Sequence, residues 1–224
     1  MKDQARVTRT PTLPRFAAQE AAKGLRYPYT LKLNRLDAVL HYRTRQRSDL
    51  DYGEALLRRR LFAWLVAHGQ RVGASELNEY DPNGCADNDE FLRVMDATEQ
   101  YEADMSVALC SCWDDVIGDV TLCGPILDFR YAWVAPAHAR GDLFPRAAHA
   151  LIDRFRCRYS ILVIKAFPLE YQAQEPEAAA RTSRALESRQ RAMARYYERI
   201  FCVRPFPELH GSEGWLFRLR GVQI

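Results

Sequence analysis

Strand-like and helix-like segments alternate along the second half of the chain, and this order restricts the fold more than any other feature. Residues 126–134, ILDFRYAWV, alternate in character and predict a strand. One face of that strand is expected to carry Leu127, Phe129, Tyr131 and Trp133. A helical stripe follows at about 142–156, and then the apolar run YSILVIKAF at 159–167, typical of a strand covered on both faces. The segment therefore predicts a β-α-β unit.

The remainder of this half adds one more helix and one more strand. Apolar positions recur with helical spacing from about 177 to 200, and WLFRLR at 215–220 reads as a strand. The whole order predicts an α/β fold, a mixed central sheet flanked by helices.

The first half has a less regular pattern. Residues 29–43 favour a strand, as do RVGASELNEY at 71–80 and VIGDVTL at 116–122. Residues 51–68 predict a helix, because several apolar side chains share one helical face and Gly69 follows at a typical C-terminal cap. The residues on that face are Leu57, Leu61, Trp64, Leu65 and His68.

Residues 89–111 predict an inserted helix, capped by Asp87 or Asn88, with Tyr101 in its apolar stripe. No linker divides the chain. We therefore expect an N-terminal extended arm at 1–28 and one domain at 29–224.

Composition limits the function classes. The chain has 224 residues with a net charge of +3, and neither a secretory signal core nor an apolar run of bilayer length stands out. These features predict a cytoplasmic protein without a membrane partner. The six cysteines are expected to be reduced, and the spacing of Cys110 and Cys112 lacks the pattern of a metal site.

Three segments resemble the GNAT superfamily of N-acetyltransferases over roughly residues 70–220. WVAPAHARGDLFPRAAHALIDRF is similar to the strand, loop and helix with which that family binds the coenzyme A pyrophosphate. ILVIKAFPLEY is similar to the next strand in a group of bacterial members, and RAMARYYERIFCVRPFP to the helix whose tyrosine approaches the cofactor sulfur. The resemblance implies a GNAT-like sheet and an acetyl-CoA or other acyl-CoA cofactor, bound between the strands ending near Val134 and Phe167.

The resemblance places the cofactor site on the loop before the helix at 142–156. The implied cofactor-binding residues are Val134, Arg140, Gly141, Asp142 and Leu143. The family's glycine-containing signature falls on Ala139, Asp142 and Phe144, none of which matches it. A Phe144 side chain obstructs the close backbone approach that a pyrophosphate needs, and Asp142 is expected to cap the helix itself.

The implied catalytic residues are Tyr197, matching the family's tyrosine, and Asp128, on the strand before the loop. The tyrosine would protonate a departing thiolate, and the carboxylate would take a proton from the amine. Glu79 and Glu170 are weaker candidates for the base. Alternatively, Tyr197 is a core residue, because it belongs to the apolar stripe of its helix.

Two classes of function follow. The lost loop residues favour a degenerate, non-catalytic relative that binds a protein partner, a second copy of itself, or nucleic acid through the arginines and tyrosines of 191–199. The alternative is an active CoA-dependent N-acyltransferase acting on an amine.

Overall fold

The computed structural model describes residues 13–33, 37–48, 55–139, 141–154, 159–168, 176–207, 210–211 and 213–220. Its strands are β1 (Tyr29–Lys32), β2 (Ala38–Ser48), β3 (Leu57–Ala67), β4 (Gln70–Asp81), β5 (Ile126–Val134), β6 (Ile161–Lys165), β7 (Arg204–Pro205) and β8 (Trp215–Leu219). Its helices are α1 (Arg15–Ala22), α2 (Asn88–Asp96), α3 (Gln100–Cys110), α4 (Leu143–Asp153) and α5 (Pro176–Phe201).

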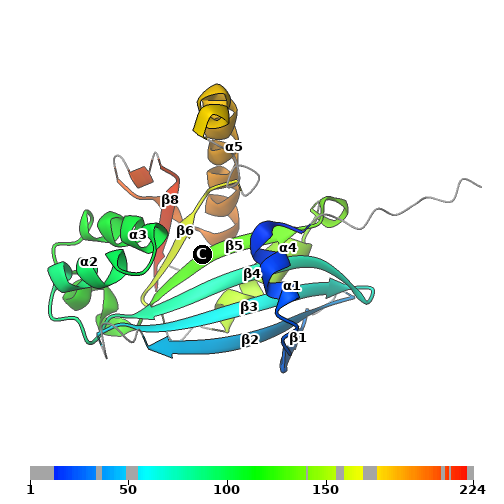
Figure 1. Cartoon of the computed structure of the whole chain (residues 1–224), viewed down its shortest axis with the longest axis horizontal. Coiled ribbons are helices and arrows are strands. Elements are labelled where there is room, and N and C mark those ends of the chain that lie inside the picture. Colours follow the sequence, from blue (N-terminus) through cyan, green and yellow to red (C-terminus); the bar gives the residue numbers. More distant parts are fainter. Residues whose placement is uncertain are drawn as a thin grey trace, which may run out of the picture.

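All the strands belong to one eight-stranded sheet with the order β1-β2-β3-β4-β5-β6-β8-β7 (Figure 1). Neighbouring strands are antiparallel, except that β5 and β6 run parallel and are connected through α4. The predicted mixed α/β fold is confirmed. The strands expected at 71–80, 126–134, 159–167 and 215–220 are present, as are the two C-terminal helices.

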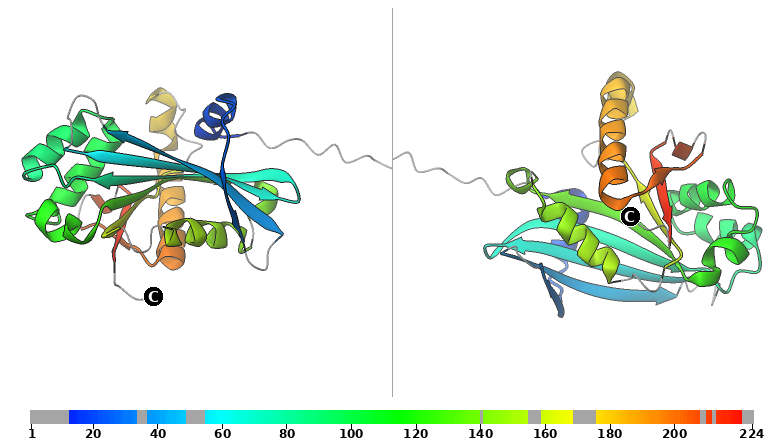
Figure 2. Two further views of the ribbon diagram at one scale, coloured as in Figure 1. Left: turned by 90° about the horizontal axis from the view of Figure 1, so that it is seen from below. Right: turned by 180° about the vertical axis from the view of Figure 1, so that it is seen from behind.

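Helices cover both faces of the sheet. One face packs against α4 and α5, whose Leu151 and Phe201 join a core with Leu61 and Leu127 (Figure 2). The other face is covered by α1 and, separately, by α2 and α3 (Figure 1), and it carries two separate apolar clusters. One lies beneath α1 around Phe62, and one lies beneath α2 and α3 and includes residues of β5, β6 and β8. Polar side chains occupy the region between these two clusters.

The helix predicted at 51–68 is wrong, because residues 57–67 form β3. Leu57, Leu61 and Leu65 are four residues apart, a spacing that places them on one face of a strand as well as on one face of a helix. Trp64 belongs to the opposite face, in the cluster beneath α1. Gly69 is a turn residue rather than a helix cap: His68 and Gly69 have φ of 49° and 74° and join β3 to β4.

Four other elements predicted before residue 126 also differ in the structure. The strand expected at 29–43 is divided into the antiparallel pair β1 and β2, and part of the expected arm forms α1. The helix expected at 89–111 is two helices, the first capped by the Asp87 side chain. The strand expected at 116–122 is instead a π-helical turn, Val116–Val120, followed by a 3-10 turn, Thr121–Cys123.

The expected common face of β5 is interrupted by a bulge. Between its pairings with Asn78 and Glu76 of β4, β5 advances from Asp128 to Tyr131, one residue more than its partner. The side chains after the bulge therefore change face. Leu127 and Phe129 lie in the core beneath α4 and α5, whereas Tyr131 and Trp133 pack against the cluster beneath α1.

The β3–β4 turn gives a direct test of the strand assignment. Gly69→Ala introduces a side chain at φ 74° and is expected to lower the free energy of unfolding by roughly 1–2 kcal/mol. Gly69→Asn is the matched control and should cost less, because asparagine adopts the left-handed region more readily. Urea unfolding of the three proteins measures the difference. Equal stability of Gly69→Ala and the wild type would contradict this turn.

Candidate functional site

The parallel strands β5 and β6 part in the middle of the sheet. They pair only at Ile126 with Ile161, Leu127 with Leu162 and Asp128 with Val163. Beyond this point, residues 129–134 of β5 continue alongside β4, while the end of β6 stays with β8 (Figure 1). Two strand edges therefore diverge from the position of Asp128. Strand edges carry backbone N–H and C=O groups that an extended ligand can bind.

Asp128 is fully buried at this point of divergence. Its Oδ1 accepts a hydrogen bond of 2.8 Å from the Tyr101 hydroxyl, and its Oδ2 one of 3.4 Å from Asn78 Nδ2. Burial raises the pKa of Asp128 to about 7, although Arg130 and the Tyr101 hydrogen bond oppose the shift. A carboxyl group with a pKa near neutrality can both accept and release a proton in that range.

Tyr101 connects Asp128 to more exposed parts of the site. Two cations lie near its ring, with Arg130 Cζ 4.4 Å and Lys165 Nζ 5.9 Å from the ring centroid. It also packs against Trp215 at a centroid distance of 5.2 Å. Burial, followed by the nearby Asp128 charge, raises the pKa of Tyr101 well above its usual value. Tyr101 therefore acts as a hydrogen-bond donor to Asp128 at neutral pH.

A buried charge network supports the pair from the β4 side. Glu102, the neighbour of Tyr101 on α3, is fully buried and accepts hydrogen bonds from Arg130 and from the Tyr80 hydroxyl at 2.9 Å. Arg58 lies 3.2 Å from the same carboxylate oxygen. Because each buried charge has an opposite charge as partner, the network fixes α3 over the sheet at this position.

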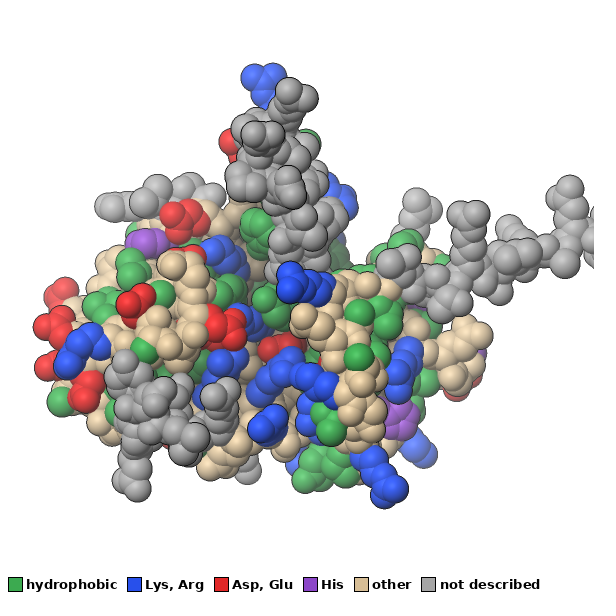
Figure 3. Space-filling model, in the orientation of Figure 1, with side chains coloured by type: hydrophobic (Ala, Val, Ile, Leu, Met, Phe, Trp, Pro, Cys, Tyr) green, Lys and Arg blue, Asp and Glu red, His purple; other side chains and the backbone are tan. Residues whose placement is uncertain are grey.

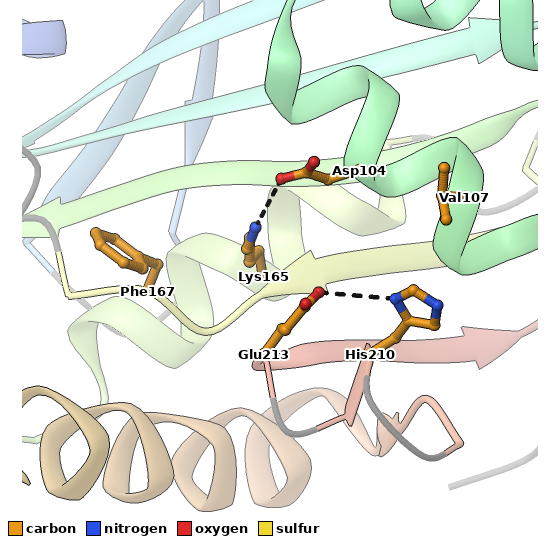
Figure 4. Close-up of a pocket in the computed structure, with 6 residues that line it drawn as sticks. All are labelled: Asp104, Val107, Lys165, Phe167, His210 and Glu213. Carbon is orange, nitrogen blue, oxygen red and sulfur yellow. Dashed lines mark hydrogen bonds and ion pairs between the residues drawn. The ribbon is translucent and has the colours of Figure 1, made fainter. Parts of the chain in front are cut away.

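A cavity of about 430 Å³ lies next to Lys165, the cation above the Tyr101 ring. It is lined by Asp104 and Val107 of α3, by Lys165 and Phe167 at the end of β6, and by His210 and Glu213 before β8 (Figure 4). Lys165 Nζ is 3.4 Å from Asp104 Oδ2, and His210 Nδ1 is 3.7 Å from Glu213 Oε2. The cavity combines groups of both charges beside the Tyr101–Asp128 pair.

The structure does not bring Tyr197 and Asp128 together on one face. Tyr197 is buried in the core beneath α4 and α5, where its ring centroid is 5.6 Å from that of Phe201. Burial raises its pKa above the usual tyrosine value. Of the weaker candidates, Glu79 pairs with Arg59 at 3.0 Å, and Glu170 lies outside the described residues.

The loop before α4 differs from expectation in two ways. The Phe144 ring points into the core, stacked on Tyr196 and edge-on to Phe129, so it does not obstruct the helix N-terminus. Asp142 makes no capping hydrogen bond through its side chain, because its backbone is helical (φ −89°, ψ −1°) rather than extended as at a typical N-cap. Its carboxylate lies 3.7 Å from Arg146 instead.

The other residues expected at the cofactor site follow the same loop. Val134 ends β5, Gly141 is exposed with φ 106°, and Leu143 begins α4. Arg140 lies outside the described residues.

The sequence predicts Asp128 as a candidate site residue but does not predict the residues that contact it. Tyr101 was expected only as a core residue of a helix, and Lys165 as part of an apolar strand. Asp104 recurs three residues after Tyr101, on the same side of α3, and this spacing is the available signal that α3 carries polar groups toward the sheet.

Other site types find no support in the part of the chain that the structure describes. It contains no group of three or more histidine, cysteine or acidic residues placed to hold a metal ion. None of its helices is long and apolar enough to cross a membrane. Comparisons of the chain with protein-family models, with curated proteins and with solved structures found no match.

The proton affinity of Asp128 predicts a pH-dependent stability. The folded state holds the Asp128 proton up to about pH 7, whereas the ordinary pKa is 3.8. The unfolded state therefore ionises first, and the contribution of this group to stability falls as the pH rises from about 4 to about 7. Asp128→Asn removes that loss, so the variant should gain stability relative to the wild type across this interval and keep the gain at higher pH.

Urea unfolding at a series of pH values measures this difference. Asp96→Asn, at an exposed carboxylate at the end of α2, is the matched control, and its stability should follow the wild-type curve. An Asp128→Asn curve parallel to that of the wild type at every pH would show that Asp128 ionises normally.

Proposed function

We propose that the protein transfers an acyl group from a coenzyme A thioester to an amine, with Asp128 as the general base. The observation that carries this proposal is the position of Asp128, a buried carboxyl group that holds its proton to near neutral pH where β5 and β6 part. The GNAT resemblance of the sequence supports the same activity. When bound, the coenzyme supplies the acyl group as a thioester.

The residues around the divergence fit the acceptor half of such a reaction. Asp104 and Glu213 give the cavity two carboxylates that attract a protonated amine. The ionised Asp128 removes the amine proton through the Tyr101 hydroxyl, which passes its own proton to Asp128 Oδ1 as it receives one from the amine. As the bond from the amine nitrogen to the acyl carbon forms, the carbon–sulfur bond of the thioester would break, and the departing thiolate would take its proton from solvent. The buried network around Glu102 holds Tyr101 in place during this transfer.

The loop before α4 also fits a phosphate-bearing coenzyme better than its sequence indicates. With Phe144 turned into the core and the Asp142 side chain directed to Arg146, the backbone N–H groups of Leu143 and Phe144 stay clear of a capping side chain. Such N–H groups at a helix N-terminus bind phosphate oxygens. The diverging edges of β5 and β6 would hold the extended arm of the coenzyme.

A non-catalytic binding function is the second candidate, supported by separate observations. Pro145 removes one backbone N–H from the first turn of α4, which weakens it as a phosphate site. In addition, α5 projects from the body of the protein (Figure 1). Several of its arginines are exposed. They are Arg184, Arg189, Arg191, Arg195 and Arg199. This surface suits an acidic protein or a nucleic acid.

Isothermal titration with acetyl-CoA and a longer acyl-CoA, followed by thiol-release assays with a panel of primary amines, tests the proposal. We expect saturable binding and amine-dependent release. Asp128→Asn should keep binding but lower the turnover number about 10²- to 10⁴-fold, the usual contribution of a general base. Asp153→Asn, at an exposed carboxylate on α4, is the control and should turn over normally.

Two outcomes would contradict this mechanism. Absence of binding for both thioesters leaves the reaction without a donor and favours the second candidate. Binding with a turnover unaffected by Asp128→Asn would remove Asp128 from the mechanism.

A further inference from the structure

A group of arginines lies on the open part of the sheet face between α1 and α3. They are Arg43 and Arg45 of β2 and Arg58 and Arg60 of β3. Arg45 is the direct cross-strand partner of Arg60, and Arg43 that of Phe62. Phe62 lies in the cluster beneath α1, so these side chains share the face that carries α1. Figure 3 shows Lys and Arg side chains gathered at the centre of this face.

Three of these four arginines form ion pairs with acidic side chains. Glu20 of α1 accepts a hydrogen bond of 2.8 Å from Arg43 Nε and lies 3.9 Å from Arg60 Nη2. Glu76 pairs with Arg60, and Glu102 with Arg58. Arg45, by contrast, is exposed and has no acidic partner among the described residues. The face therefore has a surplus of positive charge beside Arg45.

The pairing of Arg45 with Arg60 needs an explanation, since like charges directly opposite each other destabilise a sheet. Arg60 has a second unusual feature, because its Nε is buried without a hydrogen-bond partner among the described residues. Glu20 and Glu76 nevertheless fix the guanidinium groups of Arg43 and Arg60. Donors held in this way lose little conformational freedom when a ligand binds.

We propose that Arg45 and Arg60 form a binding site for the phosphate group of a small ligand. A phosphate monoester carries up to two negative charges and accepts paired hydrogen bonds from guanidinium groups, so it supplies the negatively charged partner that Arg45 lacks. Glu76 and Glu99 near this surface disfavour a long polyanion such as a nucleic acid. The site is independent of the proposed acyl transfer.

The phosphate site lies in the same row of cross-strand partners as Asp128. Arg45, Arg60, Asn78 and Asp128 are successive cross-strand partners on β2, β3, β4 and β5. Because neighbouring strands are about 4.8 Å apart, the phosphate site lies on the order of 10–15 Å from Asp128 along this row. It is therefore separate from the N-terminus of α4, which lies on the opposite face with the core beneath α4 and α5.

Inorganic phosphate is the probe, titrated at constant ionic strength against chloride and followed through the NMR signals of the arginine Nε–H groups. We expect saturable shifts in the wild type and at least about tenfold weaker binding in Arg45→Gln, which loses a charge-assisted donor. Arg93→Gln, an exposed arginine of α2, is the matched control and should bind as the wild type does. Equal affinity in Arg45→Gln and the wild type would overturn the site.

Thermal unfolding supplies a second readout. In phosphate-free buffer Arg45→Gln should unfold at a higher temperature than the wild type, because it removes a like-charge pair, and phosphate should stabilise it less. A lower unfolding temperature in that buffer would show that Arg45 has a structural partner and would overturn the proposal. A short single-stranded oligonucleotide is titrated in parallel. If the oligonucleotide binds more tightly than phosphate and its binding depends on Arg45, the ligand of this site is a nucleic acid and not a small phosphate compound.

Discussion

The separation of β5 and β6 at Asp128 determines where a functional site can form in this fold. Interior strands of a sheet ordinarily satisfy their backbone groups on both sides. Here the ladder between two central strands stops after three residue pairs, so the sheet consists of a half from β1 to β5 and a half from β6 to β8. The bulge in β5 follows directly after the last of these pairs. Since bulges bend a strand and increase its twist, it contributes to the divergence.

The second constraint is the amount of charge buried beside this point. Asp128, Glu102 and Arg130 are all buried, and a charge without a partner in such a place would be strongly destabilising. The short helix α3 resolves this by supplying Tyr101 to Asp128 and Glu102 to Arg130 from consecutive positions. Consecutive residues of a helix point about 100° apart, which allows one helix to serve two neighbouring groups. The α2–α3 insertion is therefore part of the site rather than an addition at its edge.

The sequence predicts the main strands and helices from 126 onward and offers Asp128 as a candidate, but it does not predict the geometry around Asp128. The alternation of 126–134 and the apolar run at 159–167 each match one period of secondary structure. The spacing of Leu57, Leu61 and Leu65 fits both a helix and a strand. These residues form a strand because it pairs with β2 and β4, and this pairing cannot be read from the local sequence. Nor does local alternation reveal a bulge, so Tyr131 and Trp133 were assigned to the wrong face. The role of Tyr101 depends on tertiary contact in the same way, because a tyrosine in a helical stripe is usually a core residue.

The placement of Asp128 and Tyr197 on opposite faces bears on how the two could act together. Asp128 and Phe129 are adjacent in β5, and Phe129 packs against Phe201, which in turn contacts Tyr197. Tyr197 thus lies on the Phe129 side of β5, where the Phe201 ring contacts both, while Asp128 faces α3. Because Tyr197 is buried in the core beneath α4 and α5, whereas Asp128 faces α3 on the other side of the sheet, the two residues do not flank one substrate in this structure.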